Sequence, residues 1–123
     1  MSLLKITTRD AATGPVMEIV GDLDYAHAPE LRRELDALVL RPGERLVLDL
    51  SGMTFCDSSG ITAMIAARSR AEASGAGCAL AAVPDFTLRV LRIAGLDQIF
   101  PLYPDRASAT AWAPAGRAVG VAR

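Results

Sequence analysis

The sequence predicts a single α/β domain built on a mixed sheet of four to five strands flanked by helices. Short aliphatic segments alternate along the chain with segments in which apolar residues recur every three or four positions. This is the pattern of strands alternating with helices. Only a turn separates the first two aliphatic segments, which favours an antiparallel hairpin, whereas whole helices separate the later ones. A length of 123 residues is typical of one domain.

The chain begins with the expected hairpin. Residues 3–8 and 16–20 are short runs rich in Leu, Ile, Val and Thr, and Gly14-Pro15 interrupts the chain between them. Because Gly and Pro commonly mark turns, the two runs should pair as antiparallel strands. Residues 21–24, Gly-Asp-Leu-Asp, are then expected to lead off the sheet.

A first helix is expected to begin at Pro29, because proline suits the first turn of a helix. Leu31 and Leu35 follow at helical spacing. The helix should stop near Leu40, since residues 41–43, Arg-Pro-Gly, are poor continuations of it.

Residues 45–83 are expected to form one crossover unit. Residues 45–50 and 78–83 are aliphatic runs typical of strands buried on both faces. Between them, residues 58–74 have a helical apolar pattern and many alanines, which allow close packing. Strands joined by such a helix are almost always parallel.

A third helix is expected after Pro84. Asp85 is its candidate N-cap, and Phe86, Val90 and Ile93 recur at the spacing of one helical face. Gly95 is the C-terminal stop of this helix.

The last part of the chain is less regular. Residues 99–103 could form a short final strand, and residues 105–110 a further helical turn. Residues 1–110 are therefore the predicted folded domain. Residues 111–123 are mainly Ala, Gly, Val, Pro and Arg without periodicity, which predicts a flexible C-terminal tail.

Composition and charge exclude several classes of protein. Hydrophobic residues make up 51% of the chain and charged residues 22%, which excludes a largely disordered protein. Thirteen Lys and Arg against 14 Asp and Glu leave a net charge of −1, which argues against direct nucleic-acid binding. No apolar stretch reaches about 18 residues and no signal-peptide pattern is present, so we expect a soluble, cytoplasmic protein without membrane contact.

The sequence offers no metal or cofactor site. Cys56, Cys78 and His27 are its only thiols and imidazole, with no Cys-x-x-Cys pair and no second histidine to complete a zinc site. Both cysteines lie in apolar stretches, so we expect them to be reduced and buried, with a disulfide as the alternative. His27 lies at a helix entrance, where it is either structural or a general base or phosphoryl carrier.

The acidic turn after the hairpin also has more than one interpretation. Asp22 and Asp24 are two positions apart, so they could be solvated turn residues, a cation site or a contact for a protein partner. No hydrolase elbow, phosphate-binding glycine loop with lysine, or His-Glu-x-x-His motif occurs elsewhere in the chain. The sequence therefore predicts no catalytic residues.

The most informative tetrapeptide is Asp57-Ser58-Ser59-Gly60, at the expected start of a helix. Asp or Ser could simply cap the first free amides, and Gly could allow close approach. The two serines could also be functional. Since no general base accompanies them, a hydroxyl here is better suited to accepting a phosphate than to attacking a substrate.

These motifs make the chain similar to the STAS family of bacterial anti-sigma factor antagonists. The resemblance covers about residues 3–110. It is carried by GDLD at residues 21–24, LVLDLS at 46–51, FCDSSG at 55–60 and RVLRIAGL at 89–96. It implies the small STAS fold, a mixed sheet flanked by helices.

The resemblance also implies a phosphorylation switch. Ser58 matches the serine that an anti-sigma factor phosphorylates. The resemblance implies that this anti-sigma factor is a serine kinase of the histidine-kinase-like ATPase type. Ser59 is implied as a possible secondary site. The unphosphorylated antagonist binds the anti-sigma factor and frees the sigma factor, phosphorylation ends binding, and a PP2C-type phosphatase reverses it. The residues implied to contact the partner are Asp22, Asp24, Asp57, Ser59 and Gly60.

Two other functions stay open at this level. A STAS module could be a non-enzymatic scaffold subunit of a lipid transporter or of a stress-sensing assembly. A small enzyme with Ser58 as nucleophile is the third interpretation, and the lack of a base beside Ser58 argues against it.

Overall fold

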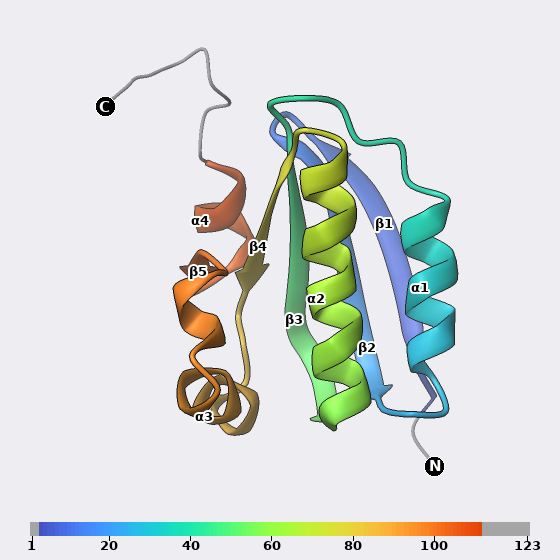
Figure 1. Ribbon diagram of the computed structural model, residues 1–123, viewed down its shortest axis with the longest axis vertical. Helices are drawn as coiled ribbons and strands as arrows, with labels where there is room; N and C mark the ends of the chain where they lie inside the picture. The colour runs from blue at the N-terminus through green and yellow to red at the C-terminus, as the bar shows by residue number, and fades with distance from the viewer. Residues whose placement is uncertain (1–2, 112–123) are drawn as a thin grey trace.

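The computed structural model describes residues 3–111. Its elements, in chain order, are β1 (Lys5–Ala11), β2 (Gly14–Leu23), α1 (Ala28–Asp36), β3 (Arg45–Cys56), α2 (Ser58–Ala73), β4 (Gly77–Ala81), α3 (Asp85–Ile93), the 3₁₀ turn η1 (Leu96–Gln98), β5 (Leu102–Tyr103) and α4 (Arg106–Thr110) (Figure 1). Apart from Ala111, the predicted tail lies outside the described residues.

The sheet is mixed and has five strands in the order β1-β2-β3-β4-β5. β1 and β2 form the antiparallel hairpin, with Ala11 opposite Gly14 at its turn. The other three pairs, β2 with β3, β3 with β4 and β4 with β5, are parallel. The predicted α/β fold with a mixed sheet is therefore confirmed.

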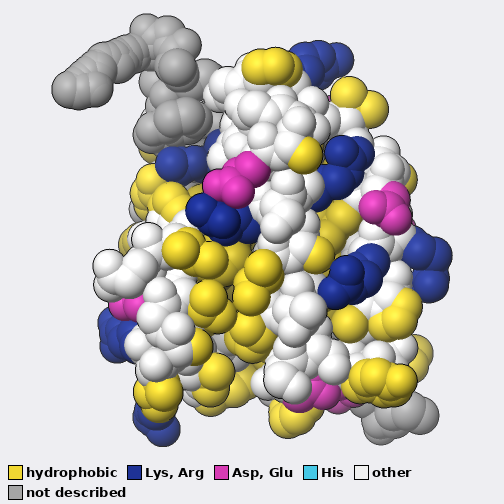
Figure 2. All heavy atoms as spheres, viewed as in Figure 1, with side chains coloured by type: hydrophobic (Ala, Val, Ile, Leu, Met, Phe, Trp, Pro, Cys, Tyr) yellow, Lys and Arg dark blue, Asp and Glu magenta, His cyan; other side chains and the backbone are white. Residues whose placement is uncertain are grey.

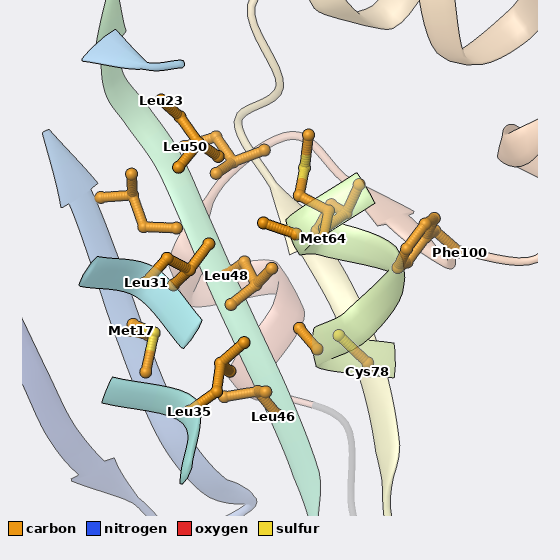
Figure 3. Close-up of a cluster of buried hydrophobic side chains, with 14 of the residues drawn as sticks. Met17, Leu23, Leu31, Leu35, Leu46, Leu48, Leu50, Met64, Cys78 and Phe100 are labelled. Carbon is orange, nitrogen blue, oxygen red and sulfur yellow. The ribbon is translucent and has the colours of Figure 1, made fainter. Parts of the chain in front are cut away.

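The main core lies between the sheet and helices α1 and α2, which lie side by side across one face of it (Figure 1). Because side chains alternate along a strand, Leu46, Leu48 and Leu50 of β3 all point into this core (Figure 3). Leu31 and Leu35 of α1 meet them there, as their helical spacing predicts. On α2 the buried residues are mostly small, Gly60, Ala63, Met64, Ala67 and Ala71, which brings this helix close to the strands.

The opposite face of the sheet is covered in part by α4. Val16, Val47 and Ala81 from the strands pack there against Ala109 of α4. Asp49, the residue between Leu48 and Leu50, also points to this face, and only 3% of its side chain is exposed. An ion pair holds α4 in place, because Arg106 contacts the Asp49 carboxylate at 2.9 Å and that of Glu18 at 3.2 Å.

Removing this ion pair is expected to destabilise the fold. In Arg106→Leu, Asp49 keeps its backbone hydrogen bond from Ser51 but loses its only ion-pair partner among the described residues. We expect the free energy of unfolding to fall by about 2 kcal/mol, since a buried charge is left uncompensated. Urea unfolding would measure this, with Arg89→Leu on the exposed side of α3 as the control. If the two variants unfolded at the same urea concentration, the ion pair of Arg106 would not stabilise the fold.

Two parallel strands are longer than the sequence pattern indicates. β2 continues to Leu23 and β3 to Cys56, so residues 21–23 remain in the sheet instead of leading off it. The two extensions pair with each other through an irregular register, with shifts after Glu18 and Gly21. Polar residues in this stretch hide the strand pattern. Helix α1, in contrast, is shorter than predicted, because it ends at Asp36 rather than near Leu40.

α3 also differs from the prediction. Its N-cap is Pro84, which makes no side-chain cap, and Asp85 is already its first residue. The predicted face of Phe86, Val90 and Ile93 points outward, with Ile93 82% exposed, while Thr87 and Leu91 are buried. This helix has apolar residues on two faces, and the spacing alone does not say which of them the domain covers.

The structure also describes the surroundings of the two cysteines. Cys56 and Cys78 are both free thiols, one half-buried and one buried. In the part of the chain that the structure describes, no cluster of His, Cys, Asp and Glu has the makings of a metal site. None of the helices between residues 3 and 111 combines the length and apolar character of a bilayer-spanning segment.

Candidate functional site

The predicted site residues meet at the carboxyl ends of β2 and β3. Leu23 is paired with Cys56 at these ends, and each strand leads within a few residues into a helix, β2 into α1 and β3 into α2. Both helices therefore begin at the same end of the sheet (Figure 1). This arrangement places the GDLD and DSSG segments next to each other, although they are far apart in the sequence.

Asp57 joins the two segments. Its carboxylate accepts a hydrogen bond from the Gly60 amide at 3.1 Å, which makes it the N-cap of α2. The other carboxylate oxygen accepts from the Tyr25 amide at 3.1 Å, in the loop after β2. Capping, the structural interpretation of this motif, is therefore correct for Asp57, and it leaves both serines free.

Gly60 is required by close packing. A Cβ atom here would lie 2.4 Å from the Leu23 carbonyl oxygen and 2.6 Å from the Cys56 sulfur. The Leu23 carbonyl oxygen is a backbone atom, so it cannot move away as the end of a flexible side chain could. Gly60 is buried, so it lies behind the surface rather than on it.

Ser58 is the first residue of α2 and is exposed. Its side chain makes no hydrogen bond to any residue between 3 and 111, while its carbonyl oxygen accepts one from the Thr62 hydroxyl at 2.9 Å. Ser59 is half-buried beside it. Ser58 therefore presents the more accessible hydroxyl of the pair.

Asp24 and His27 form a local pair at the start of α1. The Asp24 carboxylate accepts from the His27 amide at 3.0 Å and lies 2.7 Å from His27 Nδ1. Desolvation raises the pKa of Asp24, but the hydrogen bonds and charge of His27 outweigh it and hold this pKa below its ordinary value. The geometry makes His27 the N-cap residue and a partner of Asp24, which agrees with the structural interpretation of the histidine.

The remaining acid, Asp22, accepts a hydrogen bond from the Thr54 hydroxyl at 2.8 Å across the β2–β3 pair. At the end of the molecule where α2 begins, acidic side chains lie beside hydrophobic ones (Figure 2). Two aromatic residues in this region are exposed, Tyr25 at 81% and Phe55 at 48%. The sequence pattern does not mark them as surface residues, because an aromatic residue near a strand end is usually part of the core.

A shallow groove separates the first turns of α1 and α2. It has a volume of about 240 Å³, and we call it the α1–α2 groove. Its lining residues are Tyr25, Ala28, Pro29, Arg32, Ser59 and Thr62. Arg32 is the only charged residue in this lining.

The thiol next to the serines is not reactive in this setting. Burial, and then the neighbouring charge of Asp57, raise the pKa of Cys56 to about 12. Its sulfur donates to the Asp57 carbonyl oxygen at 3.5 Å. Cys56 is therefore a protonated packing residue at neutral pH.

Comparison with known proteins places this geometry in a family. A family model described as "Mlab, STAS domain" matches residues 6–103 of the chain. The chain belongs to the STAS family.

Relatives of this STAS domain include an anti-sigma F factor antagonist from Paenibacillus polymyxa. It is 28% identical over 95 residues, which are 76% of this chain and 81% of the relative. Among solved structures, an anti-sigma factor antagonist from Mycobacterium paratuberculosis is 29% identical with a TM-score of 0.78, covering 89% of this chain and 92% of that one.

The same STAS fold occurs in another setting. A sulfate transporter family protein from Wolinella succinogenes has a TM-score of 0.68 at 21% identity, over 78% of this chain and 80% of that one. At this identity the likeness concerns the fold alone.

Proposed function

We propose that this STAS domain is an anti-sigma factor antagonist in the cytoplasm, controlled by phosphorylation of Ser58. The observation that carries the proposal is the unbonded, exposed hydroxyl of Ser58 among acidic and aromatic side chains at one end of the sheet. The likeness to two anti-sigma factor antagonists at 28% and 29% identity supports it. The partner would be an anti-sigma factor with serine-kinase activity of the histidine-kinase-like ATPase type.

The fold can accept a phosphate at this position. Ser58 is at the N-terminus of α2, where the helix dipole and unpaired amides favour negative charge by roughly 0.3–1 kcal/mol. Its hydroxyl holds no structural hydrogen bond in the described part of the chain, so modification breaks none there. Asp57 remains the cap of the helix. The modification therefore changes the surface while leaving the fold in place.

The phosphate would act on the partner. A kinase that modifies Ser58 must bring the phosphates of its nucleotide to this hydroxyl. A phosphoryl group carries about −1.5 to −2 charges at neutral pH. Left on Ser58 beside Asp57, it would face the anionic nucleotide of the same partner, and like charges placed together weaken an interface. The partner-binding surface includes Asp22, Asp24, Asp57 and Ser59, with Gly60 supporting it from below and Ser59 as a secondary acceptor.

We propose no catalytic activity for the chain itself. The single histidine of the sequence is paired with Asp24, and the Cys56 thiol is protonated at neutral pH. Reversal of the modification would then fall to a separate phosphatase of the PP2C type. Direct contact with nucleic acid or a membrane is not part of the proposal.

The switch can be tested with a charge mimic. In Ser58→Asp we expect binding to the anti-sigma factor purified from the native host to weaken by about tenfold or more, since a charge is added inside the interface. Ser58→Asn is the matched control, because asparagine has nearly the same shape as aspartate but carries no charge. Calorimetric titration would measure both affinities.

The same pair of variants tests the tolerance of the fold. We expect melting temperatures of Ser58→Asp and Ser58→Asn within a few degrees of the parent, because acidic residues are favourable in a first helical turn. A fall of Ser58→Asp by many degrees would sink the claim that position 58 tolerates negative charge. Equal affinity of the two variants would sink the switch itself.

The scaffold function is the second candidate. The same fold in a sulfate transporter family protein keeps it open. A pull-down from the native host separates the two, because the switch requires recovery of a kinase-type anti-sigma factor. Recovery of a transporter ATPase in its place would favour the scaffold.

A further inference from the structure

Arg32 is a cation in the α1–α2 groove that makes no ion pair within the described residues. It is exposed on α1 and lines the α1–α2 groove together with Ser59 and Thr62. No residue between 3 and 111 makes a hydrogen bond or ion pair with its guanidinium. Asp36, one turn further along α1, lines the neighbouring groove with Arg32 but makes no ion pair with it.

Other arginines on the same side of the domain are already engaged. Arg68 of α2 pairs with Glu72 at 2.9 Å. Arg70 donates to the Leu35 and Leu38 carbonyl oxygens at 3.2 and 2.8 Å. Both therefore have structural roles, which Arg32 lacks.

Ser58 is next in sequence to one residue of the α1–α2 groove, Ser59, and one helical turn before another, Thr62. Thr62 follows it by four positions, so the two side chains lie on one face of α2, one turn apart. The Thr62 hydroxyl bonds the Ser58 carbonyl oxygen at 2.9 Å, which fixes this stacking. A phosphate on Ser58 Oγ would therefore be attached next to two residues that line the groove with Arg32.

We propose that Arg32 binds the phosphate on Ser58 and holds it against α1. The inference rests on the proposed function for its biological meaning, since it concerns the modified form. A guanidinium presents planar N–H donors that match phosphate oxygens, and such charge-assisted bonds are the strong ones. The charged groups at the starts of the two helices are then Arg32 on α1, Asp57 beside Ser58 and the Asp24–His27 pair, whereas Asp36 lies one turn beyond Arg32 and lines a different groove.

This contact gives the switch a second component. Besides repelling the partner, the phosphate would recruit Arg32 and bridge the first turns of α1 and α2. The groove that the unmodified protein leaves open would then be closed at its mouth. A partner that inserts a side chain into the groove would lose this contact at the same time.

The test uses phosphoserine installed at position 58 during translation, so that no kinase is needed. The second pKa of the phosphate, about 6 for a free phosphoserine, is measured by phosphorus NMR titration. A neighbouring cation stabilises the doubly charged form and lowers this pKa. We expect Arg32→Gln to raise it by about 0.3–0.7 units, the size of an exposed ion pair.

Arg33→Gln is the matched control. Arg33 is the next residue, is exposed and does not line the groove, yet its loss changes the net charge by the same amount. We expect it to leave the phosphate pKa close to that of the parent, and Arg32→Lys to retain most of the lowered value. Equal titrations of the Gln variants at 32 and 33 would overturn the proposal.

The contact of Arg32 with the phosphate and the modification of Ser58 by a kinase are measured independently. Titration of the installed phosphoserine reports only on Arg32, and it gives its answer even if no kinase modifies Ser58. Loss of the proposed function would show instead in the labelling of Ser58 by the anti-sigma factor. Melting curves of the three phosphorylated variants, which should coincide, would show whether a changed pKa reflects misfolding.

Discussion

Replacing Ser58 with alanine is expected to abolish nearly all phosphate transfer from ATP to this protein by its anti-sigma factor. The hydroxyl of Ser58 is the exposed one of the serine pair and has no partner in the described structure, whereas Ser59 is half-buried in the α1–α2 groove. Intact-mass spectrometry after incubation with the kinase should show one added phosphate on the parent and almost none on Ser58→Ala.

Ser59→Ala is the control for this experiment. It removes a neighbouring hydroxyl in the same turn of α2 and should retain most of the labelling. Labelling that survives unchanged in Ser58→Ala would exclude Ser58 as the acceptor. If both variants lost half of the label, the two serines would be equivalent acceptors, contrary to their difference in exposure.

Gly60→Ala is expected to destabilise the domain by about 2–3 kcal/mol, the usual cost of an extra methyl group forced into a packed interior. The added carbon would lie 2.4 Å from the Leu23 carbonyl oxygen, and relief requires α2 to move away from the end of β2. Alanine is the better helix former by about 1 kcal/mol, which offsets part of this cost. The melting temperature should fall by roughly 5–15 °C.

Gly77→Ala provides the comparison. Gly77 begins β4, and a Cβ there would have no neighbour within 4 Å. Its melting temperature should stay close to that of the parent. If Gly60→Ala and Gly77→Ala had the same melting temperature, the close approach of α2 to β2 would not exist in solution.

Much of the fold could be predicted because its core follows simple periodicities. The aliphatic run in β3 and the leucines of α1 point inward as their spacing requires. The pattern was insufficient where polar residues continue a strand, as at Asp22 and Thr54, which bond each other across β2 and β3. It was also insufficient on α3, where Phe86 and Leu91 are both apolar but only Leu91 is covered.

The site was only partly visible in the sequence for a related reason. Asp57 and Gly60 act locally, within one helical turn, so their spacing alone indicates a cap and a close approach. The role of Asp57 in holding Tyr25, and the position of Arg32 beside Ser59, depend on how α1 is placed against α2. Contacts of this kind exist only after the sheet has brought the two helices together.

The hydrogen bond from the Tyr25 amide to Asp57 spans 32 positions of the chain. The surface around the acceptor serine is therefore discontinuous in sequence, and a synthetic peptide copying residues 52–64 would contain the serine without most of its surroundings. An enzyme that recognises this surface reads a three-dimensional epitope rather than a linear motif. Screens for the modifying kinase should accordingly present the intact domain, and peptide arrays built on the serine tetrapeptide would miss it.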